Sequence, residues 1–466
     1  MAVRREPMSG LGRSVIGHAY PFGMVRMRTH VAVLLLAVLS FAACAGGSKG
    51  AAYDPASRNT SELDSAIQAP PVPKSLSTST TLAPTGATYY VASRGNDSNK
   101  GTKDEPFKTI SHGVGRLKAG DTLMIGPGEY VEDDGDAGLR IKNLNGTAAK
   151  PITIAGGSAE KPRLTGGLWK TVAVEKSSFI VLRGLETIGT AMTDKKPTSG
   201  IEIIDSHHVT VADSYVHDGG GGGIGSIRSN HISVIGNYVA GMAKWNPFQT
   251  SGISLFDSTN IGGDADADGY SMRIVDNVVF GTENIALPNG GNTVTDGNCI
   301  IVDTGDTNRY AGRTYIANNV CANNGGRGIH VFKSQNVVAV NNTLYHNMQT
   351  AKLKEEGGEL SAVSARGVIF RNNLVVARSN RKASFTYQSE GITFDANLYE
   401  GEGKAPTGTE LMAPNVGLAA PDDGNFALLA GSPAIDVGDS DGAPATDQEG
   451  KPRRGQPDVG AFEAAS

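Results

Sequence analysis

The sequence has little charge, little cysteine and no strongly basic segment. Charged residues make up 19% of its 466 positions, the formal net charge is −5, and there are only three Cys. No Lys/Arg run is long enough to follow a phosphate backbone, so we expect no nucleic-acid partner. The low charge also argues against a disordered polyampholyte. A neutral or polyhydroxy ligand suits this composition better.

The sequence also lacks an apolar run long enough to cross a bilayer. Its main apolar stretch, 31–43, follows Arg26 and Arg28 and ends in small residues before Cys44. A basic start, a short apolar core and small residues before a cleavage point are typical of an export signal. The ending resembles a bacterial lipobox, which implies a lipid on Cys44, although Phe41 stands where such motifs usually have Leu.

We therefore expect a signal over residues 1–44, with Met24 or Met27 as the initiator. The protein is then an exported cell-envelope lipoprotein, on the periplasmic face or at the outer membrane, with the lipid as its one membrane contact. An ordinary signal peptide with an incidental Cys is the alternative. Residues 45–87 are rich in Ala, Ser, Thr and Pro without apolar periodicity, so we expect a flexible linker there.

Glycine, by contrast, is abundant, and it accompanies a repeat. The 61 Gly have no Gly-X-Y period, which excludes collagen and implies many turns. A small polar residue followed by two apolar residues recurs, twice at a separation of 23 residues and elsewhere with insertions. A period in the twenties built from Val/Ile-rich strands and Gly/Asn turns predicts a β-solenoid. The recurring polar positions are Ser214, Asn237, Asn277, Asn319, Asn342, Asn373 and Asn397.

The repeated Asn predicts a ladder of side chains at one corner of the solenoid. An Asn amide can hydrogen-bond the equivalent Asn one rung away and so satisfy the polar groups of each turn. Helical repeats are excluded, because segments such as 209–216 and 232–239 read as strands.

The chain resembles the right-handed parallel β-helix proteins of the pectate-lyase-like superfamily over nearly all of 88–466. Segment 89–97 and the motifs after it are similar to the entry segment of the family-nine pectate-lyase-like group. The Ser432–Asp436 and Asp458–Glu463 segments resemble the closing segment of bacterial envelope β-helices. We expect an all-β right-handed parallel β-helix over 88–410 and a carboxy-terminal cap segment over 411–466. The helical spacing of Phe107, Ile110, Val114 and Leu117 predicts a short amino-terminal capping helix.

A second register of the repeat places candidate site residues on one sheet. The segments 200–206, 223–229, 252–258, 299–304, 328–334 and 359–365 align, and strand alternation then sorts their faces. Insertions 241–251, 282–297 and 347–358 enter the same sheet and are candidate walls of a groove. The residues expected to point inward are Ile201, Ile203, Ile253, Leu255, Ile300, Val302, Ile329 and Val331. Those expected to point outward are Glu202, Ile204, Ser254, Phe256, Ile301, Asp303, His330 and Phe332. The edge column reads Asp205, Arg228, Asp257, Thr304, Lys333 and Ser364.

The resemblance implies a chemistry for this strip. In lyases of this fold a Lys or Arg removes the proton alpha to a uronate carboxylate, and bound calcium offsets the acid charge. We accordingly predict catalytic roles for Lys333, Arg327, His330 and Asp303. Substrate-binding roles fall to Phe256, Phe332, Arg228 and Asn298, and metal-binding roles to Asp296 and Asp257. A solvated sheet edge is the alternative for Lys333, Asp257 and His330, and a plain Asp-Gly turn for Asp296.

A further calcium candidate is the acidic run Asp264, Asp266 and Asp268. It matches the first half of an EF-hand loop, but Val275 stands where the bidentate Glu belongs, so only a looser calcium loop is left, with a solvated acidic turn as the default. Cys299 and Cys321 lie in apolar strand-like stretches, which favours two buried thiols over a disulfide.

We thus predict a monomeric polysaccharide-active enzyme. The favoured reaction is calcium-assisted β-elimination on a uronate-containing polysaccharide, and acidic or neutral polysaccharides are the expected partners. A glycoside hydrolase with two of Asp257, Asp296 and Asp303 as its carboxylates, a uronate epimerase, and a non-catalytic binding or export accessory are the alternatives.

Overall fold

The structure is a computed structural model. It describes residues 61–70, 85–157, 160–189, 196–263, 269–288, 291–305, 309–354, 357–401 and 409–464. Within these ranges, no helix is both long enough and apolar enough to span a membrane.

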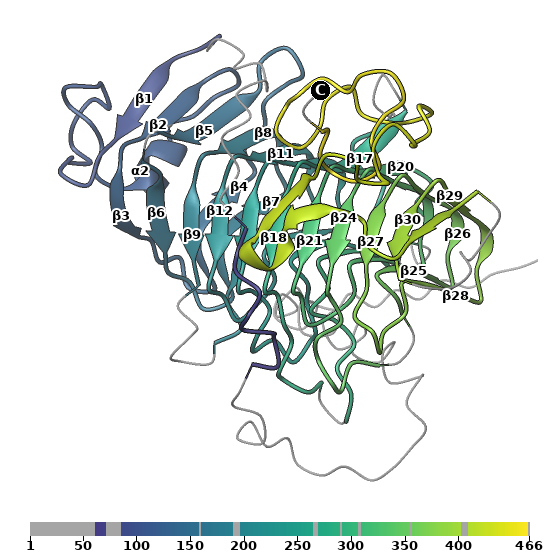
Figure 1. Cartoon of the computed structure of the whole chain (residues 1–466). Helices are drawn as coiled ribbons and strands as arrows, with labels where there is room; N and C mark the ends of the chain where they lie inside the picture. The colour runs from purple at the N-terminus through teal and green to yellow at the C-terminus, as the bar shows by residue number, and fades with distance from the viewer. Residues whose placement is uncertain are drawn as a thin grey trace, which may run out of the picture. The chain divides into compact units, whose positions relative to one another are not determined.

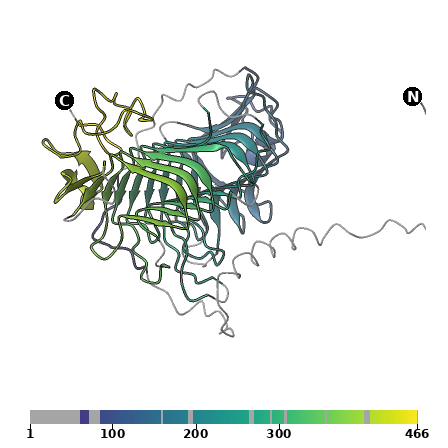
Figure 2. The ribbon, with the colours of Figure 1, turned by 90° about the vertical axis from the view of Figure 1, so that its right-hand side faces the viewer.

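The chain winds into a right-handed parallel β-helix made of three parallel sheets, which we name sheets A, B and C. Figure 1 shows the strands stacked side by side along one axis, and Figure 2 shows the same coils from the right-hand end of that view. The fold class predicted from the repeat is confirmed. Sheet A contains β1 (Thr88–Val91), β2 (Thr122–Ile125), β5 (Ile152–Gly156), β8 (Ser178–Arg183), β11 (His207–Ala212), β14 (Asn230–Ile235), β17 (Tyr270–Val275), β20 (Arg313–Ala317), β23 (Gln335–Val340), β26 (Arg366–Arg371) and β29 (Glu390–Asp395).

Sheets B and C complete each coil. Sheet B contains β3 (Gly128–Val131), β6 (Pro162–Thr165), β9 (Glu186–Ile188), β12 (Tyr215–His217), β15 (Tyr238–Ala240), β18 (Val278–Phe280), β21 (Val320–Ala322), β24 (Thr343–Tyr345), β27 (Leu374–Val376), β30 (Leu398–Glu400) and β31 (Leu411–Ala413). Sheet C contains β4 (Ala137–Lys142), β7 (Lys170–Glu175), β10 (Ser199–Ile204), β13 (Ile224–Ile227), β16 (Ile253–Phe256), β19 (Ile300–Asp303), β22 (Ile329–Phe332), β25 (Leu360–Val363) and β28 (Ser384–Tyr387).

The core fills the inside of the solenoid because alternate residues of every strand point inward. In sheet C, Ile224 pairs with Ile253, which pairs with Ile300, so the sequence-derived register is confirmed. All eight residues expected to point inward from this sheet belong to the buried core, which extends without interruption from the first coils to the last. Each coil thus buries its apolar side chains against the coils before and after it.

The predicted Asn ladder lies at the corner between sheets A and B. The side-chain oxygen of Asn319 accepts from the backbone N–H and the amide of Asn277, at 3.0 and 2.9 Å. The amide of Asn319 in turn donates to Asn342 Oδ1 at 2.9 Å. The ladder runs from Ser214 to Asn397 and ends on Glu410.

A second ladder, which the sequence analysis missed, lies at the corner between sheets B and C. Thr282 N donates to Asn324 Oδ1, and Asn324 donates to Asn347 Oδ1. Asn347 then donates to both carboxylate oxygens of the fully buried Glu359, which therefore ends this ladder.

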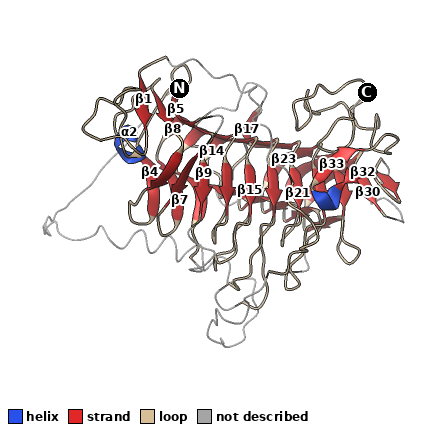
Figure 3. Ribbon diagram, turned by 60° about the vertical axis from the view of Figure 1, so that its left-hand side comes forward, coloured by secondary structure: helices blue, strands red, loops and turns tan. Residues whose placement is uncertain are grey.

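A short helix closes the amino-terminal end. Helix α2 (Ile110–Val114) begins after the N-cap Thr109, whose side chain accepts from His112 N, and it packs against β1, β2 and β4. All four residues whose spacing predicted this helix are buried in the core, so the capping helix is confirmed. Figure 3 shows it at the amino end of an otherwise almost strand-only molecule.

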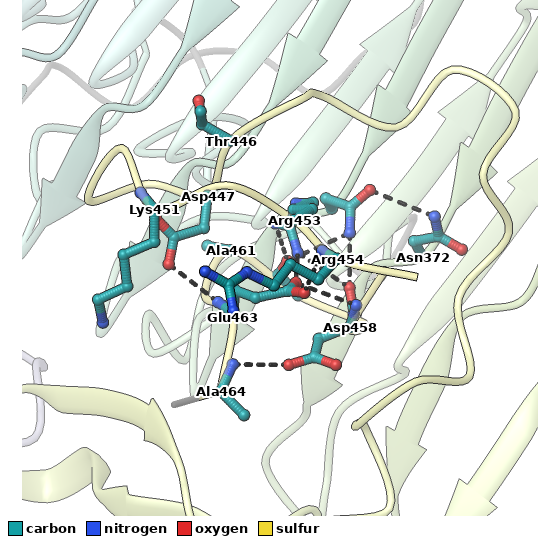
Figure 4. A network of polar contacts seen from close by, with 12 residues as sticks. Asn372, Thr446, Asp447, Lys451, Arg453, Arg454, Asp458, Ala461, Glu463 and Ala464 are labelled. Atoms are coloured by element: carbon teal, nitrogen blue, oxygen red, sulfur yellow. Dashed lines mark hydrogen bonds and ion pairs between the residues drawn. The ribbon is translucent and has the colours of Figure 1, made fainter. Parts of the chain in front are cut away.

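The carboxy-terminal segment folds back onto the solenoid. It contains the antiparallel pair β32 (Leu418–Ala420) and β33 (Asn425–Leu428), joined by the 3-10 helix η2 (Pro421–Asp423). Apolar residues of this segment form a second core with the outward side chains of sheet B. Figure 4 shows Arg453 and Glu463 within the polar network that holds its last residues. Arg453 donates to Glu463 at 3.0 Å and to the side-chain oxygen of Asn318 at 2.9 Å.

Residues 61–70, which we call the amino-terminal strap, also lie on the solenoid. They fall within the segment for which we expect a linker. Ser61 Oγ and Glu62 N donate to the two carboxylate oxygens of Glu283, at 2.6 and 2.7 Å. Ile67 joins the second core, and Tyr238 donates its hydroxyl to the carbonyl of Pro70 at 3.0 Å.

Cys299 and Cys321 form a disulfide, which corrects the expectation of two thiols. Both residues are fully buried, as predicted, and their Cα atoms lie 5.6 Å apart. Cys299 directly precedes β19 of sheet C and Cys321 lies in β21 of sheet B, so the disulfide links two sheets across the interior of one coil. Composition alone gave no sign of this, since a buried thiol and a buried disulfide occupy similar apolar surroundings.

Candidate functional site

The outer face of sheet C carries the strip of residues that the sequence singled out. Phe256 pairs with Asp303, and Asp303 pairs with Phe332, so these three side chains form one column on consecutive strands. The next residue of each strand forms a column at the corner with sheet A. All members of that corner column have left-handed backbones, with φ between 44° and 52°: Lys176, Asp205, Arg228, Asp257, Thr304, Lys333, Ser364 and Gln388.

The corner column is accessible and carries charges of both signs. Arg228 donates to both carboxylate oxygens of Asp205, at 2.8 and 3.1 Å, and both side chains stay more than one-third exposed. Lys333 is half-buried, with its ammonium 5.2 Å from the centre of the Phe332 ring. Asp257 is also half-buried, and its backbone N–H donates to the carbonyl of Asp303. Adjacent rungs are about 4.8 Å apart, so these groups line one edge of the sheet at short intervals.

Three outward residues are hidden despite their direction. Ile301, Asp303 and His330 are each less than a tenth exposed. His330 Nδ1 lies 2.5 Å from the hydroxyl of Ser361, which occupies the same column one strand later. Burial, with a smaller contribution from Arg327, holds the pKa of His330 well below its usual value, so this imidazole is neutral at physiological pH.

Asp296, Asn298 and Arg327 form a buried polar cluster at the entry to sheet C. Asp296 accepts from Thr295 Oγ1 and from the amide of Asn298, both at 2.9 Å. Asn298 Oδ1 accepts from the backbone N–H of Arg327 at 2.9 Å. Burial raises the pKa of Asp296 despite these hydrogen bonds and the nearby guanidinium. The carboxylate of Asp296 thus accepts its hydrogen bonds from side chains of the same buried region.

The guanidinium of Arg327 joins two insertions. It donates to the carbonyl of Thr295 at 2.7 Å and to that of Lys354 at 3.1 Å, and its residue is 3% exposed. The same insertions are linked by a bridge between Val294 and Leu353. Arg327 thus holds together two loops that the sequence analysis named as candidate groove walls. The longest loops leave the sheet B strands at their lower ends in Figure 1.

The open part of the face lies nearer the amino-terminal end, on β10, β13 and β16. Glu202, Gly225 and Ser254 form one outward column there, and all are partly exposed. A Cβ built on Gly225 would meet no atom nearer than 3.8 Å, so the sheet surface is bare at this point. Burial raises the pKa of Glu202 against the lowering effect of Lys170. The sequence analysis placed Glu202 outward but did not assign it a role.

Metal binding finds little support among the described residues. Within the described ranges, no three His, Cys, Asp or Glu side chains come together as a metal site. Asp257 and Asp296 lie apart, one at the corner and one in the buried cluster. The acidic run Asp264, Asp266 and Asp268 and the lipidation candidate Cys44 lie outside the described residues.

Three comparisons relate the chain to known proteins. A family model described as "Protein of unknown function (DUF1565)" matches residues 93–351. The uncharacterized protein YwoF of Bacillus subtilis (strain 168) is 29% identical over 159 residues, which are 34% of this chain and 27% of that relative. The chain thus matches about a quarter of the length of this curated relative.

Solved structures with a similar backbone path include a pectate lyase, a lacto-N-biosidase and a complex with xylose. Pectate lyase Pel9A is 17% identical, with a TM-score of 0.44, and the match covers 82% of this chain and 97% of that one. A GH136 lacto-N-biosidase from Eubacterium ramulus is 16% identical, with a TM-score of 0.45 and coverages of 71% and 62%. The complex of XylC with xylose is 11% identical, with a TM-score of 0.41, and the match covers 80% of this chain and 98% of that one. At these identities and TM-scores, the likenesses identify no reaction for this chain.

Proposed function

The chain belongs to the DUF1565 family, because the residues matched by the family model make up more than half of the chain, and we propose that it is a polysaccharide-active enzyme that works on the outer face of sheet C. The observation that carries the proposal is the accessible corner column. There, Arg228, Asp257 and Lys333 lie beside the half-buried rings of Phe256 and Phe332. This edge suits a long acidic sugar chain that runs parallel to the solenoid axis, because it offers cations, a carboxylate and aromatic rings at regular intervals.

The favoured reaction is β-elimination on a uronate residue, with Lys333 as the base. Its amine, when unprotonated, takes the proton alpha to the uronate carboxylate. The electron pair left behind forms the C4–C5 double bond, and the C4–O glycosidic bond breaks. The departing oxygen takes up a proton, so one unsaturated sugar end and one new hydroxyl end result. Arg228, paired with Asp205, offers its guanidinium to a carboxylate elsewhere on the same chain.

Calcium stays a prediction. The described residues do not form a metal site by themselves, so we derive no step through a metal. Activity measured with and without a chelator, followed by added calcium, addresses the prediction directly. Loss and recovery would support calcium as a cofactor, and indifference to the chelator would contradict it.

The test of the lyase is a panel of pectate, alginate and related uronates, followed by ultraviolet absorbance of the unsaturated product. Lys333→Ala should lower the rate at least about 100-fold, the range expected when a general base is removed. Lys382→Ala is the matched control, because Lys382 also lies over an aromatic ring, that of Phe385 at 4.4 Å. It should keep the wild-type rate. Equal rates for the Lys333→Ala variant and the wild type would contradict the assignment.

A hydrolase on the same face is the second candidate, and the position of two carboxylates favours it. Asp257 follows Phe256, whose partner on the next strand is Asp303. Hydrolysis needs two such carboxylates, and it produces reducing ends without absorbance. Asp303→Asn should then abolish the release of reducing ends, with Asp423→Asn, at an exposed carboxylate of the carboxy-terminal segment, as the control. Binding with neither product would favour a non-catalytic accessory.

A further inference from the structure

An exposed aromatic pair stands beside sheet C and has no role in the proposed chemistry. Trp169 is 37% exposed and Phe248 is 42% exposed, although large rings are normally buried. Their centroids lie 6.1 Å apart and their planes are tilted by 44°. Trp169 directly precedes β7, and Phe248 belongs to the insertion between β15 and β16. Two segments far apart in sequence therefore bring their rings together at the surface.

The pair adjoins the open part of the sheet C face. Lys170, the residue after Trp169, pairs across the sheet with Ser199 on β10. Three residues further along β10 is Glu202, and beside it lies the bare surface at Gly225. The insertion that carries Phe248 leads into β16, whose Ser254 completes the same open column. The two rings thus stand at the side of an accessible strip of sheet.

Charged groups lie on the residue next to Trp169 and on or beside the neighbouring strands. The ammonium of Lys170 lies 3.2 Å from a carboxylate oxygen of Asp136 and 3.9 Å from one of Glu202. These groups supply both donors and acceptors within one small area. An apolar protein partner would leave such charges desolvated at a cost. A sugar ring suits both the aromatic pair and the charged groups, since its C–H face stacks on an aromatic ring and its hydroxyls exchange hydrogen bonds with charged side chains.

We propose that Trp169 and Phe248 form a binding subsite for a pyranose ring of the polysaccharide, with Lys170 and Glu202 as hydroxyl-binding groups. The inference rests on the proposed function, because it assigns a second point of contact to the same substrate. From β7 to β22, the strand that Lys333 follows, the order of sheet C has five steps, or roughly 24 Å at about 4.8 Å per rung. The subsite therefore serves long chains, and short oligosaccharides cannot reach both it and Lys333.

Binding is tested by fluorescence, because the chain has only two Trp, Trp169 and Trp245. In a Trp245→Phe background the emission reports Trp169 alone. Titration with polygalacturonate, alginate or xylan should change that emission for at least one of them. In affinity electrophoresis on the same polymer, Trp169→Ala and Phe248→Ala should each weaken binding about tenfold, or about 1.4 kcal/mol. Leu429→Ala, which removes an exposed apolar side chain of the carboxy-terminal segment, is the control and should bind as the wild type does.

Several outcomes would overturn the subsite. One is unaltered affinity in both ring variants, when their circular dichroism matches the wild type. Another is an unchanged Trp169 emission with every polymer. A third is self-association in sedimentation that Trp169→Ala abolishes, because the pair would then contact a second copy of the chain.

A kinetic measurement separates this inference from the proposed function. If the enzyme is active, Trp169→Ala should raise KM for long oligosaccharides about tenfold and leave KM for short ones unchanged, with kcat the same for both. A uniform loss of kcat would instead indicate structural damage and contradict a binding role. If the polymer changes Trp169 emission but no product appears, the subsite stands and the enzymatic proposal fails.

Discussion

Asp276 is a half-buried carboxyl group that lies against the carboxy-terminal segment. It follows β17 at the corner between sheets A and B, where the amide of Asn318 donates to it at 3.0 Å. Burial, with a smaller contribution from Asp447, raises its pKa from the ordinary value of 3.8 to about 7. Asn318 and the nearby Arg453 act in the opposite direction but do not outweigh the burial.

This pKa predicts a specific pH dependence of stability. The folded state binds the proton more tightly than the unfolded state, so the contribution of Asp276 is complete below about pH 4 and is lost as the pH rises through 7. Each pKa unit corresponds to about 1.4 kcal/mol. Asp276→Asn should therefore flatten the fall in unfolding free energy between pH 5 and pH 8, measured by urea unfolding at both values.

The control for this measurement is Asp423→Asn, an exposed carboxylate of the same segment. It should keep the wild-type slope. A slope that is equally steep in Asp276→Asn and the wild type would show that other groups cause the pH dependence.

At the residue scale, alternation predicted the direction of a side chain but not its depth. Ile301, Asp303 and His330 point outward as expected, yet they are almost fully buried. Strand alternation is a local property, whereas exposure on an outer face depends on how distant insertions fold over it. The same limit applies to Arg327, whose partners belong to two different insertions. The aromatic pair was missed for this reason too, since nothing local connects Trp169 with Phe248.

At the element scale, the corners determine the register. Each ladder Asn accepts from the backbone N–H of the previous rung and donates to a carbonyl of that same previous rung, so the position is the same in every coil. The amide of Asn319, for instance, donates to the carbonyl of Ile274 at 2.8 Å as well as to Asn342. A residue type required at each turn leaves a periodic signal, which explains why the strand alignment could be predicted despite insertions of different lengths.

Replacement of one ladder residue should therefore cost more than a typical surface substitution. Asn319→Ala leaves the buried N–H of Asn277 and the carbonyl of Ile274 without their partners. Each buried unsatisfied group costs about 1–3 kcal/mol, so we expect a loss of at least about 2 kcal/mol in thermal or urea unfolding. Asn425→Ala, at an exposed turn with one hydrogen bond to Ala427 N, is the matched control. Similar melting of the two variants would contradict a stabilising ladder.

At the scale of the whole molecule, segments from both ends of the described chain cover sheet B. The strap contributes Ile67 and the carboxy-terminal segment contributes Phe426 to the same second core. They also touch each other, because Gln68 N donates to the carbonyl of Asp422 at 2.6 Å. Sheet C carries no such cover from either segment among these contacts, which agrees with its proposed use as the working face.

Removal of the strap should destabilise the solenoid. A protein that starts at residue 71 loses the apolar contact of Ile67 and leaves the buried carboxylate of Glu283 without the donors from Ser61 and Glu62. Its melting temperature should be lower than that of a protein that starts at residue 51. Ile67→Ala alone should cost about 2 kcal/mol, whereas Ser65→Ala, at an exposed position of the strap, should cost nothing measurable. Identical melting with and without the strap would mean that it contributes no stability.

The two Asn ladders end in the same chemical way, and this bears on how long such a protein can grow. An Asn both accepts from the rung before and donates to the rung after, so a ladder of Asn alone always leaves its last amide in need of an acceptor. Glu410 and Glu359 supply that acceptor on the final rung of their ladders. A carboxylate at a ladder position is therefore a terminator. Gain or loss of ladder rungs within a family should be accommodated between the first Asn and this Glu, and the place of the Glu in a sequence should count the rungs of its ladder.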